Sequence, residues 1–265
     1  MLTGINRSVN RGLWGLWLVL LVLTLGRQIW AFQTLYGARN ELFEAVFRGG
    51  PLLLGGLICA RVPREFSGRF RAAWLWVAAC VWSFALGAII SSSLQFVAGE
   101  VVYPSIADVP FTLSMPLLVV GLFYLPYTPY CRLQAWRLSL DASIIVTVLA
   151  GYGWYFVLAP ALLRHASRGG IGVPVIVATS YPIYDLLVLA GLLIASAQRQ
   201  RTSVGPEVRW IALGIGFWFL ADAYFLACCF IDGLPVAHPL EAGWAWGMLI
   251  FAFAALRSNN LQPNG

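Results

Sequence analysis

Residues 72–94, AAWLWVAACVWSFALGAIISSSL, contain no charged side chain. An α-helix needs about 20 consecutive apolar residues to cross the hydrocarbon core of a bilayer, so this stretch predicts a transmembrane helix. The rest of the chain continues the pattern, because 60% of its 265 residues are hydrophobic and 11% are charged. A soluble domain carries roughly a quarter charged residues. The sequence therefore predicts an all-α fold, a polytopic integral membrane helix bundle.

We expect about eight transmembrane helices, of which the second is the least regular. Arg48 lies near its start, and Gly49, Gly50 and Pro51 follow, so this run is compatible with a continuous or a broken helix. The N-terminal residues resemble a signal peptide, but no small-x-small cleavage site follows the first run, so we expect a retained helix. The eight runs lie at about residues 12–32, 43–60, 72–94, 105–125, 138–160, 174–197, 210–231 and 240–256.

All 17 basic residues are arginine, and the absence of lysine excludes a retinal Schiff base. With the N-terminus inside, twelve arginines fall on the cytoplasmic side and five outside, as the positive-inside rule requires. We therefore expect a multi-pass protein of a bacterial cytoplasmic (inner) membrane, with both termini inside. The net charge of +6 then serves contact with anionic lipid, and no nucleic-acid partner is expected. The inner group is Arg7, Arg11, Arg61, Arg64, Arg69, Arg71, Arg132, Arg137, Arg199, Arg201, Arg209 and Arg257, and the outer group is Arg27, Arg39, Arg48, Arg164 and Arg168.

Four aspartates fall inside the expected helices: Asp108, Asp141, Asp185 and Asp222. An aspartate at the centre of a membrane helix costs about 2.5–3.5 kcal/mol on insertion scales, so each needs a partner or a function. Asp141 lies four residues after Arg137, and either a helix-surface ion pair or a position near the helix N-terminus explains it as an interface acid. Asp108 lies near the outer end of its helix, where an acid either caps the N-terminus or takes part in binding.

Asp185 and Asp222 lie near the middle of two consecutive, antiparallel helices, so we expect both at the mid-membrane level. Two carboxyl groups at this depth would share a proton or need hydroxyl donors. Tyr181, Tyr184 and Tyr224 are the nearest candidate donors along the chain. The sequence leaves open whether this is a binding site or a polar network that fixes helix packing.

A short motif occurs twice, as YPSIAD at residues 103–108 and as YPIYD at residues 181–185. The first copy opens one expected helix and the second lies within another, and both helices run inward under the expected topology, so the copies suggest two parallel helix-hairpin units. The prolines favour kinks, which bring polar groups into a bundle. We therefore add Tyr103, Pro104, Tyr181 and Pro182 to the candidate ligand-binding or switch residues.

Catalytic and metal motifs are absent from the sequence. The two histidines, His165 and His238, fall in expected outer loops, which excludes an in-membrane bis-histidine haem. No G-x-S-x-G, Walker A or H-E-x-x-H pattern occurs, and the five cysteines lack C-x-x-C spacing. We therefore expect no metal site and no cofactor.

Four stretches carry a family resemblance: YPSIADVPF at 103–111, LSLDASIIV at 138–146, SYPIYDLLV at 180–188 and GFWFLADAYF at 216–225. Over about residues 71–256, the chain resembles the N-terminal multi-helix membrane region of bacterial diguanylate cyclases and related GGDEF/EAL signalling proteins. The residues that match the family's pattern are Pro104, Asp108, Asp141, Pro182, Asp185 and Asp222.

The resemblance implies a signal-input (sensor) domain, here residues 1–257, that regulates a cyclic di-GMP effector through its last helix. Residues 258–265 are then a cytoplasmic tail or the start of a linker to an output domain, and no GGDEF signature lies in this chain. The implied partners are the lipid bilayer, an unidentified small-molecule or lipid signal, an output domain in cis or in trans, and a second copy in a homodimer.

Two other interpretations stay open. Paired aspartates would also suit an intramembrane hydrolase, and FWFLADAYF at 217–225 is similar to the aspartate helix of lysoplasmalogenase-like membrane enzymes. The parallel repeat would suit a small-molecule transporter. The sequence leaves open whether this chain is an enzyme.

Overall fold

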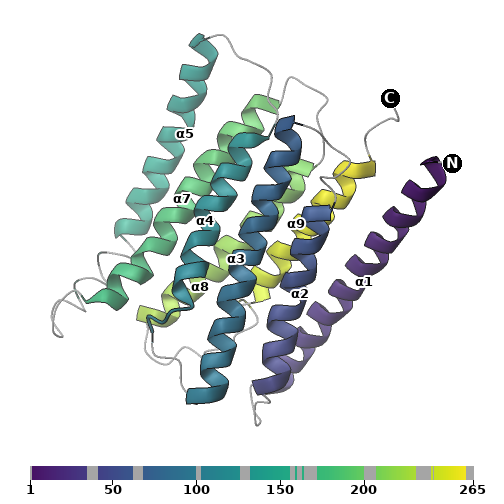
Figure 1. The fold of residues 1–265 in the computed structure, drawn as a ribbon. Helices are drawn as coiled ribbons and strands as arrows, with labels where there is room; N and C mark the ends of the chain where they lie inside the picture. Colours follow the sequence, from purple (N-terminus) through teal and green to yellow (C-terminus); the bar gives the residue numbers. More distant parts are fainter. Residues whose placement is uncertain are drawn as a thin grey trace.

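The computed structural model describes residues 2–34, 41–61, 68–99, 103–125, 132–155, 159, 163, 172–199, 207–230, 240 and 242–260. Within these ranges the long elements are all α-helices and no strand occurs, which confirms the all-helical prediction (Figure 1). Both histidines and Cys131 lie outside the described residues. The helices are α1 (Leu2–Thr34), α2 (Glu41–Arg61), α3 (Gly68–Ala98), α4 (Asp108–Tyr124), α5 (Arg132–Gly153), α7 (Val173–Arg199), α8 (Glu207–Phe230) and α9 (Ala242–Asn260).

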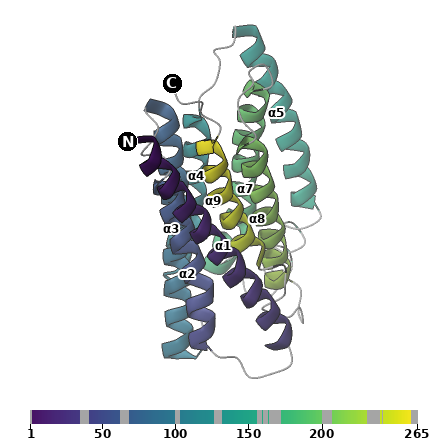
Figure 2. The same ribbon diagram turned by 90° about the vertical axis from the view of Figure 1, so that its right-hand side faces the viewer.

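The helices alternate in direction and pack as one bundle (Figures 1 and 2). α3 packs between α2 and α4, α4 packs against α7, α7 against α8, and α8 against α9. α9 then returns to α1 and α2, which closes the bundle on itself. α5 lies at the edge, against α7. The start of α1 and the end of α9 lie at the same end of the bundle.

Several helix bounds differ from the apolar runs. α1 begins at Leu2 rather than at residue 12, α4 at Asp108 rather than at 105, and α5 spans Arg132–Gly153 rather than 138–160. α9 continues to Asn260, so the expected tail at 258–265 begins as helix. Hydrophobicity marks only the part of a helix that needs an apolar environment, whereas backbone hydrogen bonding continues through polar flanks. α2 is continuous across Pro51, so the alternative of a broken second helix is wrong.

Three helical stretches among the described residues are long and apolar enough to cross a membrane: Arg11–Ile29, Gly68–Ala98 and Val208–Phe225. Four shorter apolar stretches accompany them, at Gly49–Arg61, Asp108–Tyr124, Ser139–Gly153 and Thr179–Leu193. The 17 residues of α4 rise about 26 Å, slightly less than the ~30 Å hydrocarbon core of a typical bilayer. This set of helices indicates a membrane protein.

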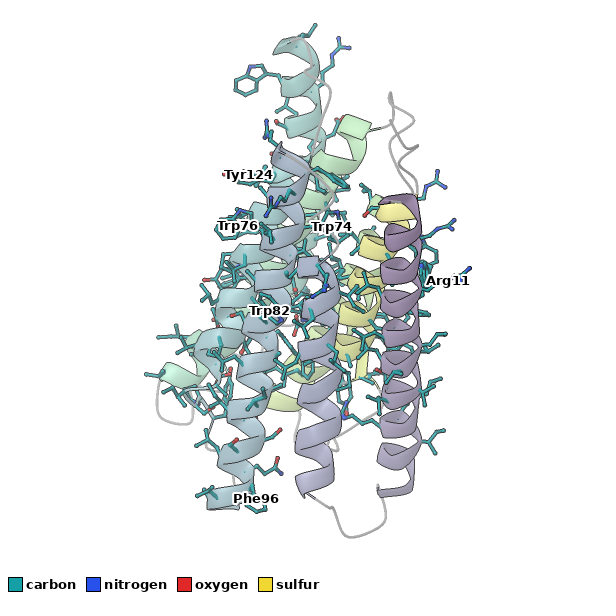
Figure 3. All side chains as sticks on the ribbon, turned by 45° about the vertical axis from the view of Figure 1, so that its right-hand side comes forward. Arg11, Trp74, Trp76, Trp82, Phe96 and Tyr124 are labelled. Carbon is teal, nitrogen blue, oxygen red and sulfur yellow. The ribbon has the colours of Figure 1, made fainter. Side chains whose placement is uncertain are left out.

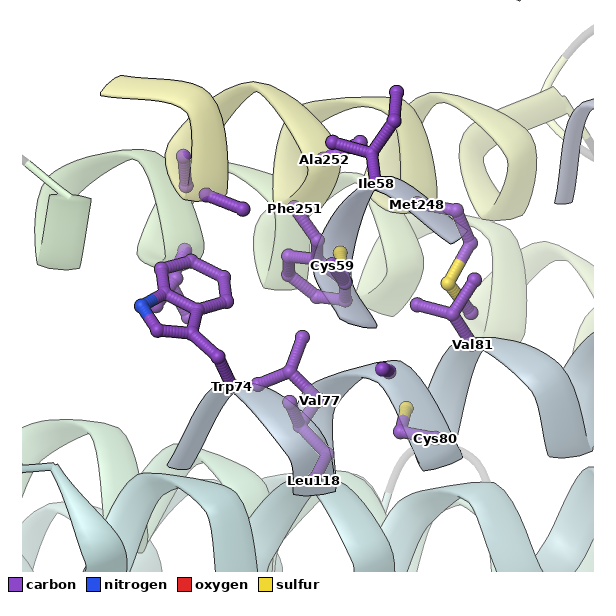
Figure 4. Packing of buried hydrophobic residues seen from close by; sticks show 14 of the residues in the cluster. Ile58, Cys59, Trp74, Val77, Cys80, Val81, Leu118, Met248, Phe251 and Ala252 are labelled. Carbon is purple, nitrogen blue, oxygen red and sulfur yellow. The ribbon is translucent and has the colours of Figure 1, made fainter. Parts of the chain in front are cut away.

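The core lies where α2, α3, α4 and α9 meet (Figure 4). Trp74 and Phe251 are its largest fully buried side chains, and they fill the space between α3 and α9. Cys59 and Cys80 are buried in the same cluster as free thiols, where they act as small packing residues. Trp17 of α1 donates a hydrogen bond from Nε1 to the Leu249 carbonyl oxygen at 3.1 Å, which ties the first helix to the last.

Exposed arginines gather at the end of the bundle where α1 begins and α9 ends. Figure 3 shows Arg11 toward this end of the bundle, together with Trp76 and Tyr124. The rings of Trp76 on α3 and Tyr124 on α4 pack against each other with their centroids 6.4 Å apart. Arg69 donates to the Phe123 carbonyl oxygen at 3.3 Å and so links the start of α3 to the end of α4. The exposed arginines of this end are Arg11, Arg61, Arg69, Arg71, Arg137, Arg209 and Arg257.

Candidate functional site

Asp185 of α7 and Asp222 of α8 meet inside the bundle. Their side chains are 6% and 5% exposed, and the two carboxyl groups lie within hydrogen-bonding reach of each other. The sequence placed both at mid-membrane depth, and the structure brings them into contact. We call these two residues the acidic pair. Two like charges about 4 Å apart repel by about 4 kcal/mol at an effective dielectric constant of about 20, so the pair is costly when both groups are ionised.

Trp244 of α9 is the third member of this site. Its Nε1 donates a hydrogen bond of 2.8 Å to Oδ1 of Asp222. The other oxygen of Asp222, Oδ2, is buried and accepts no hydrogen bond from a donor group in the described part of the chain. The contact with Asp185 therefore becomes a hydrogen bond only when one carboxyl group carries a proton.

Glycines bring Trp244 to Asp222. A Cβ on Gly243 would collide with the Phe217 carbonyl oxygen, and one on Gly247 would lie 2.7 Å from the Gly214 carbonyl oxygen. Such distances mean that the α8 and α9 backbones are in direct contact, as in small-x-x-x-small packing of membrane helices. The sequence GWAWG at residues 243–247 thus places two tryptophans between the two contact glycines, and the first of them, Trp244, binds Asp222.

Aromatic rings pack around Trp244, the donor to Asp222. Phe84 of α3 packs edge-to-face on Trp218, with a distance of 5.3 Å between the ring centroids. The centroid of the Phe84 ring lies 6.1 Å from that of Trp244. Trp244 also packs against Phe225 of α8 at 6.1 Å. These four residues, Phe84, Trp218, Phe225 and Trp244, form the aromatic surround. They make the site apolar, so they strengthen every electrostatic interaction within it.

A second polar cluster joins the two copies of the repeated motif. The Tyr181 hydroxyl group of α7 donates to Oδ1 of Asp108 at 2.9 Å. Oδ2 of Asp108 accepts from the Ser105 backbone N–H at 2.7 Å, one turn before α4. The tyrosine of the second motif thus binds the aspartate of the first. Asp108 both tethers the start of α4 and fixes α4 against α7.

Phe225 connects this cluster to the acidic pair. Its ring packs edge-to-face on Tyr181 at 5.8 Å and on Tyr103 at 5.7 Å, while its other neighbour is Trp244. One ring of α8 therefore contacts the first tyrosine of each motif copy and the tryptophan that binds Asp222. The two polar clusters belong to one continuous region.

The other residues predicted for the site differ in how deeply they are buried. Tyr184 packs against the hydrophobic core, and Tyr224 and Pro104 are half-buried. Asp141 is exposed on α5 and does not join the other three aspartates. Pro182 lies in α7, but its side chain is not among those described.

Sequence reasoning missed Trp244 and the other three members of the aromatic surround. Aromatic residues are frequent in this chain, so no single one is prominent. The available signal was the pair of glycines four residues apart around Trp244, which marks a close helix contact.

Replacing Tyr181 by phenylalanine tests the link between the repeated motifs. We expect a loss of about 1–3 kcal/mol in the free energy of unfolding, since the hydrogen bond to a carboxylate disappears while the ring contacts stay. Thermal unfolding of the purified protein in lipid nanodiscs measures this. Tyr184→Phe is the matched control on the same helix and should change stability by less than about 0.5 kcal/mol. Equal effects of the two changes would contradict the assignment.

The geometry permits proton binding, polar ligand recognition or carboxyl-based acid–base chemistry at the acidic pair. In the described part of the chain, no three His, Cys, Asp or Glu side chains come together as a metal site. No family model, no curated protein and no solved structure matches this chain.

Proposed function

We propose that the chain is a membrane-embedded signal-input module that regulates a cytoplasmic effector of the cyclic di-GMP type. In this proposal all eight helices cross a bacterial inner membrane, with both termini in the cytoplasm. The exposed arginines at one end of the bundle support that orientation. Reporter fusions at the helix connections test the topology, and an active periplasmic reporter after residue 260 would contradict it.

One observation carries the proposal: Trp244 connects the buried acidic pair to α9. α9 is the helix whose C-terminal end, near Arg257, lies with the start of α1. A change in the state of Asp222 therefore acts directly on the helix that would lead to an output domain. A sensor needs such a contact between its signal site and its output element, because a signal shifts only an equilibrium whose two states it binds differently.

The acidic pair also lies at the contact between α7 and α8, which differs in kind from the contact between α8 and α9. α8 and α9 share a direct backbone contact at their glycines, whereas α7 meets α8 through side chains that include the two acids. We infer that α8 and α9 move together and that α7 moves relative to them. The displacement at the acidic pair would then reach the end of α9 as a shift or rotation of that helix.

Asparagine at position 185 or 222 is expected to remove signal-dependent output while the protein still inserts. An asparagine amide preserves the shape of the aspartate side chain, but it neither ionises nor binds a proton at the pH values at which cells grow. The measurement is the cyclic di-GMP level in cells that express the chain fused to a diguanylate cyclase domain, compared across external pH and lipid composition.

The matched control for that experiment is Asp141→Asn on the exposed face of α5. It should respond like the wild type, and immunoblots of membrane fractions should show equal amounts of all variants. An unchanged response in both Asp185→Asn and Asp222→Asn would refute the proposed function.

The direct contact of two carboxyl groups favours a second candidate, an intramembrane hydrolase of the lysoplasmalogenase type. A dyad that shares one proton can activate water, as in aspartic proteases. Purified protein in detergent would then hydrolyse an ether lipid, and Asp222→Asn would abolish turnover. Absence of turnover by the wild-type protein removes this candidate and leaves the sensor proposal untouched.

A further inference from the structure

We propose that the ligand of the acidic pair is a proton, held between the carboxyl groups of Asp185 and Asp222, and that its loss separates α7 from α8 and α9. The proton site stands on the geometry of the pair. Its use as the signal that the module reads rests on the proposed function.

The unmatched oxygen of Asp222 is the first support. Oδ1 is occupied by the Trp244 indole N–H, whereas the buried Oδ2 accepts from no donor group in the described ranges. The group within hydrogen-bonding reach is the Asp185 carboxyl, which is itself an acceptor when ionised. One shared proton turns this acceptor–acceptor contact into a hydrogen bond. Trp218 lies one helical turn before Asp222 on α8, and its buried Nε1–H donates to no acceptor in the described ranges. An unmatched buried carboxylate oxygen requires an explanation beyond core packing.

The charges around the pair are the second support. Within the described residues, Asp222 is the charged group that acts on Asp185, and Asp222 in turn has the Trp244 N–H and Asp185 as its polar partners. No arginine on the packed helices faces the pair in this part of the chain, since those described are exposed near the helix ends. The other titratable or charged side chains described on α4, α5, α7, α8 and α9 are Asp108, Tyr124, Arg137, Asp141, Tyr152, Tyr181, Tyr184, Arg209, Tyr224 and Arg257.

Size and ligand number exclude larger cations. Calcium takes six to eight oxygen ligands, whereas one oxygen of Asp222 is already bound to an N–H group and the surround consists of aromatic rings. An organic ammonium ion would have to enter between two carboxyl groups that are already in contact. A proton needs no additional space.

The consequence of proton loss follows from the packing. When both groups are ionised, Asp185 on α7 is repelled by Asp222, while the Trp244 N–H and the glycine contacts hold Asp222 and α8 to α9. The protonated pair therefore keeps α7 against α8 at low pH, and deprotonation opens this contact as the pH rises. The response is a displacement of α8 and α9 together.

The test uses the full chain in lipid nanodiscs, with pH as the probe. Infrared difference spectra should show a carboxylic acid C=O band in the wild-type protein that titrates with pH. The midpoint of this band should change in Asp185→Asn and in Asp222→Asn, because each variant removes one carboxyl group and its repulsion of the other, and it should be unchanged in the control Asp141→Asn. In Trp244→Phe the midpoint should move to higher pH by about one unit, because a hydrogen bond that stabilises the ionised form is removed.

Spin labels at Leu187 of α7 and Leu220 of α8, both exposed, report the movement in a cysteine-free background. Their distance should increase with pH in the wild type and stay constant in Asp222→Asn. A pH-independent band and distance in the wild type would overturn the inference, and so would a band midpoint that neither asparagine variant changes. If the asparagine variants fail to fold, the midpoint shift in Trp244→Phe decides, and no shift overturns the proposal.

The same experiments separate this inference from the proposed function. A titrating pair whose α7–α8 distance changes, together with a fused cyclase that ignores pH, would refute signalling by this site and leave the proton site intact. A cyclase that responds to lipid composition while the band does not titrate would retain the sensor and reject the proton as its ligand.

Discussion

Leucine at both Gly243 and Gly247 is expected to prevent α9 from docking on α8 and so to abolish the folded bundle. A Cβ at either position already meets a backbone carbonyl oxygen of α8, those of Phe217 and Gly214. Backbone atoms cannot rotate out of the way as a side chain can. Overpacking typically costs about 1–3 kcal/mol per site, and here we expect values at the upper end or above for each position. Two such losses are a large fraction of the roughly 5–15 kcal/mol that stabilises a folded protein.

The measurement is thermal unfolding in nanodiscs, together with resistance to limited proteolysis. Gly247→Ala alone should lower the unfolding temperature, and the double leucine variant should yield no cooperative transition. Gly216→Ala is the matched control on α8, because a Cβ there meets no atom within 4 Å. Alanine has the higher helix propensity, so this control should be neutral or more stable by about 0.5–1 kcal/mol. Equal behaviour of Gly216→Ala and Gly247→Ala would disprove the backbone contact.

Trp244→Ala should have the second-largest effect, a loss of about 3–5 kcal/mol in the free energy of unfolding. It removes the ring contacts with Phe84 and Phe225 and also the hydrogen bond to Asp222. Trp244→Phe separates these contributions, since it retains most of the ring contact and leaves only Oδ1 of Asp222 without its donor. For that variant we expect a loss of about 1–3 kcal/mol.

Unfolding midpoints in nanodiscs measure both Trp244 variants. Trp136→Phe, on the exposed surface of α5, controls for loss of an indole without burial and should stay within about 0.5 kcal/mol of the wild type. If Trp244→Phe costs nothing in the background of Asp222→Ala, which removes the acceptor, but destabilises the protein in the native background, the two side chains are coupled as the structure shows. Additive losses would instead mean that the 2.8 Å hydrogen bond contributes nothing.

The repeated motif shows how a local pattern acquires its meaning only in the fold. The two copies suggested two parallel helix-hairpin units, and each copy ends in an aspartate, Asp108 or Asp185. In the structure their roles differ, because Asp108 binds Tyr181 of the other copy whereas Asp185 meets Asp222. α4 and α7 lie side by side, and this packing places the two motifs together. No feature within either motif distinguishes these outcomes.

Local chemistry alone predicted that the chain is helical, approximately where its apolar helices lie and that Asp185 and Asp222 lie deep within them. Those properties depend on the length of apolar runs and on the cost of placing a carboxylate among them, which are readable residue by residue. The partners of the acids were decided only by tertiary structure. Contact between Asp185 and Asp222, and the choice of Trp244 as donor, depend on how far α8 and α9 approach and how each helix is rotated. The glycines set that approach, because backbones can touch only where both helices lack bulky side chains.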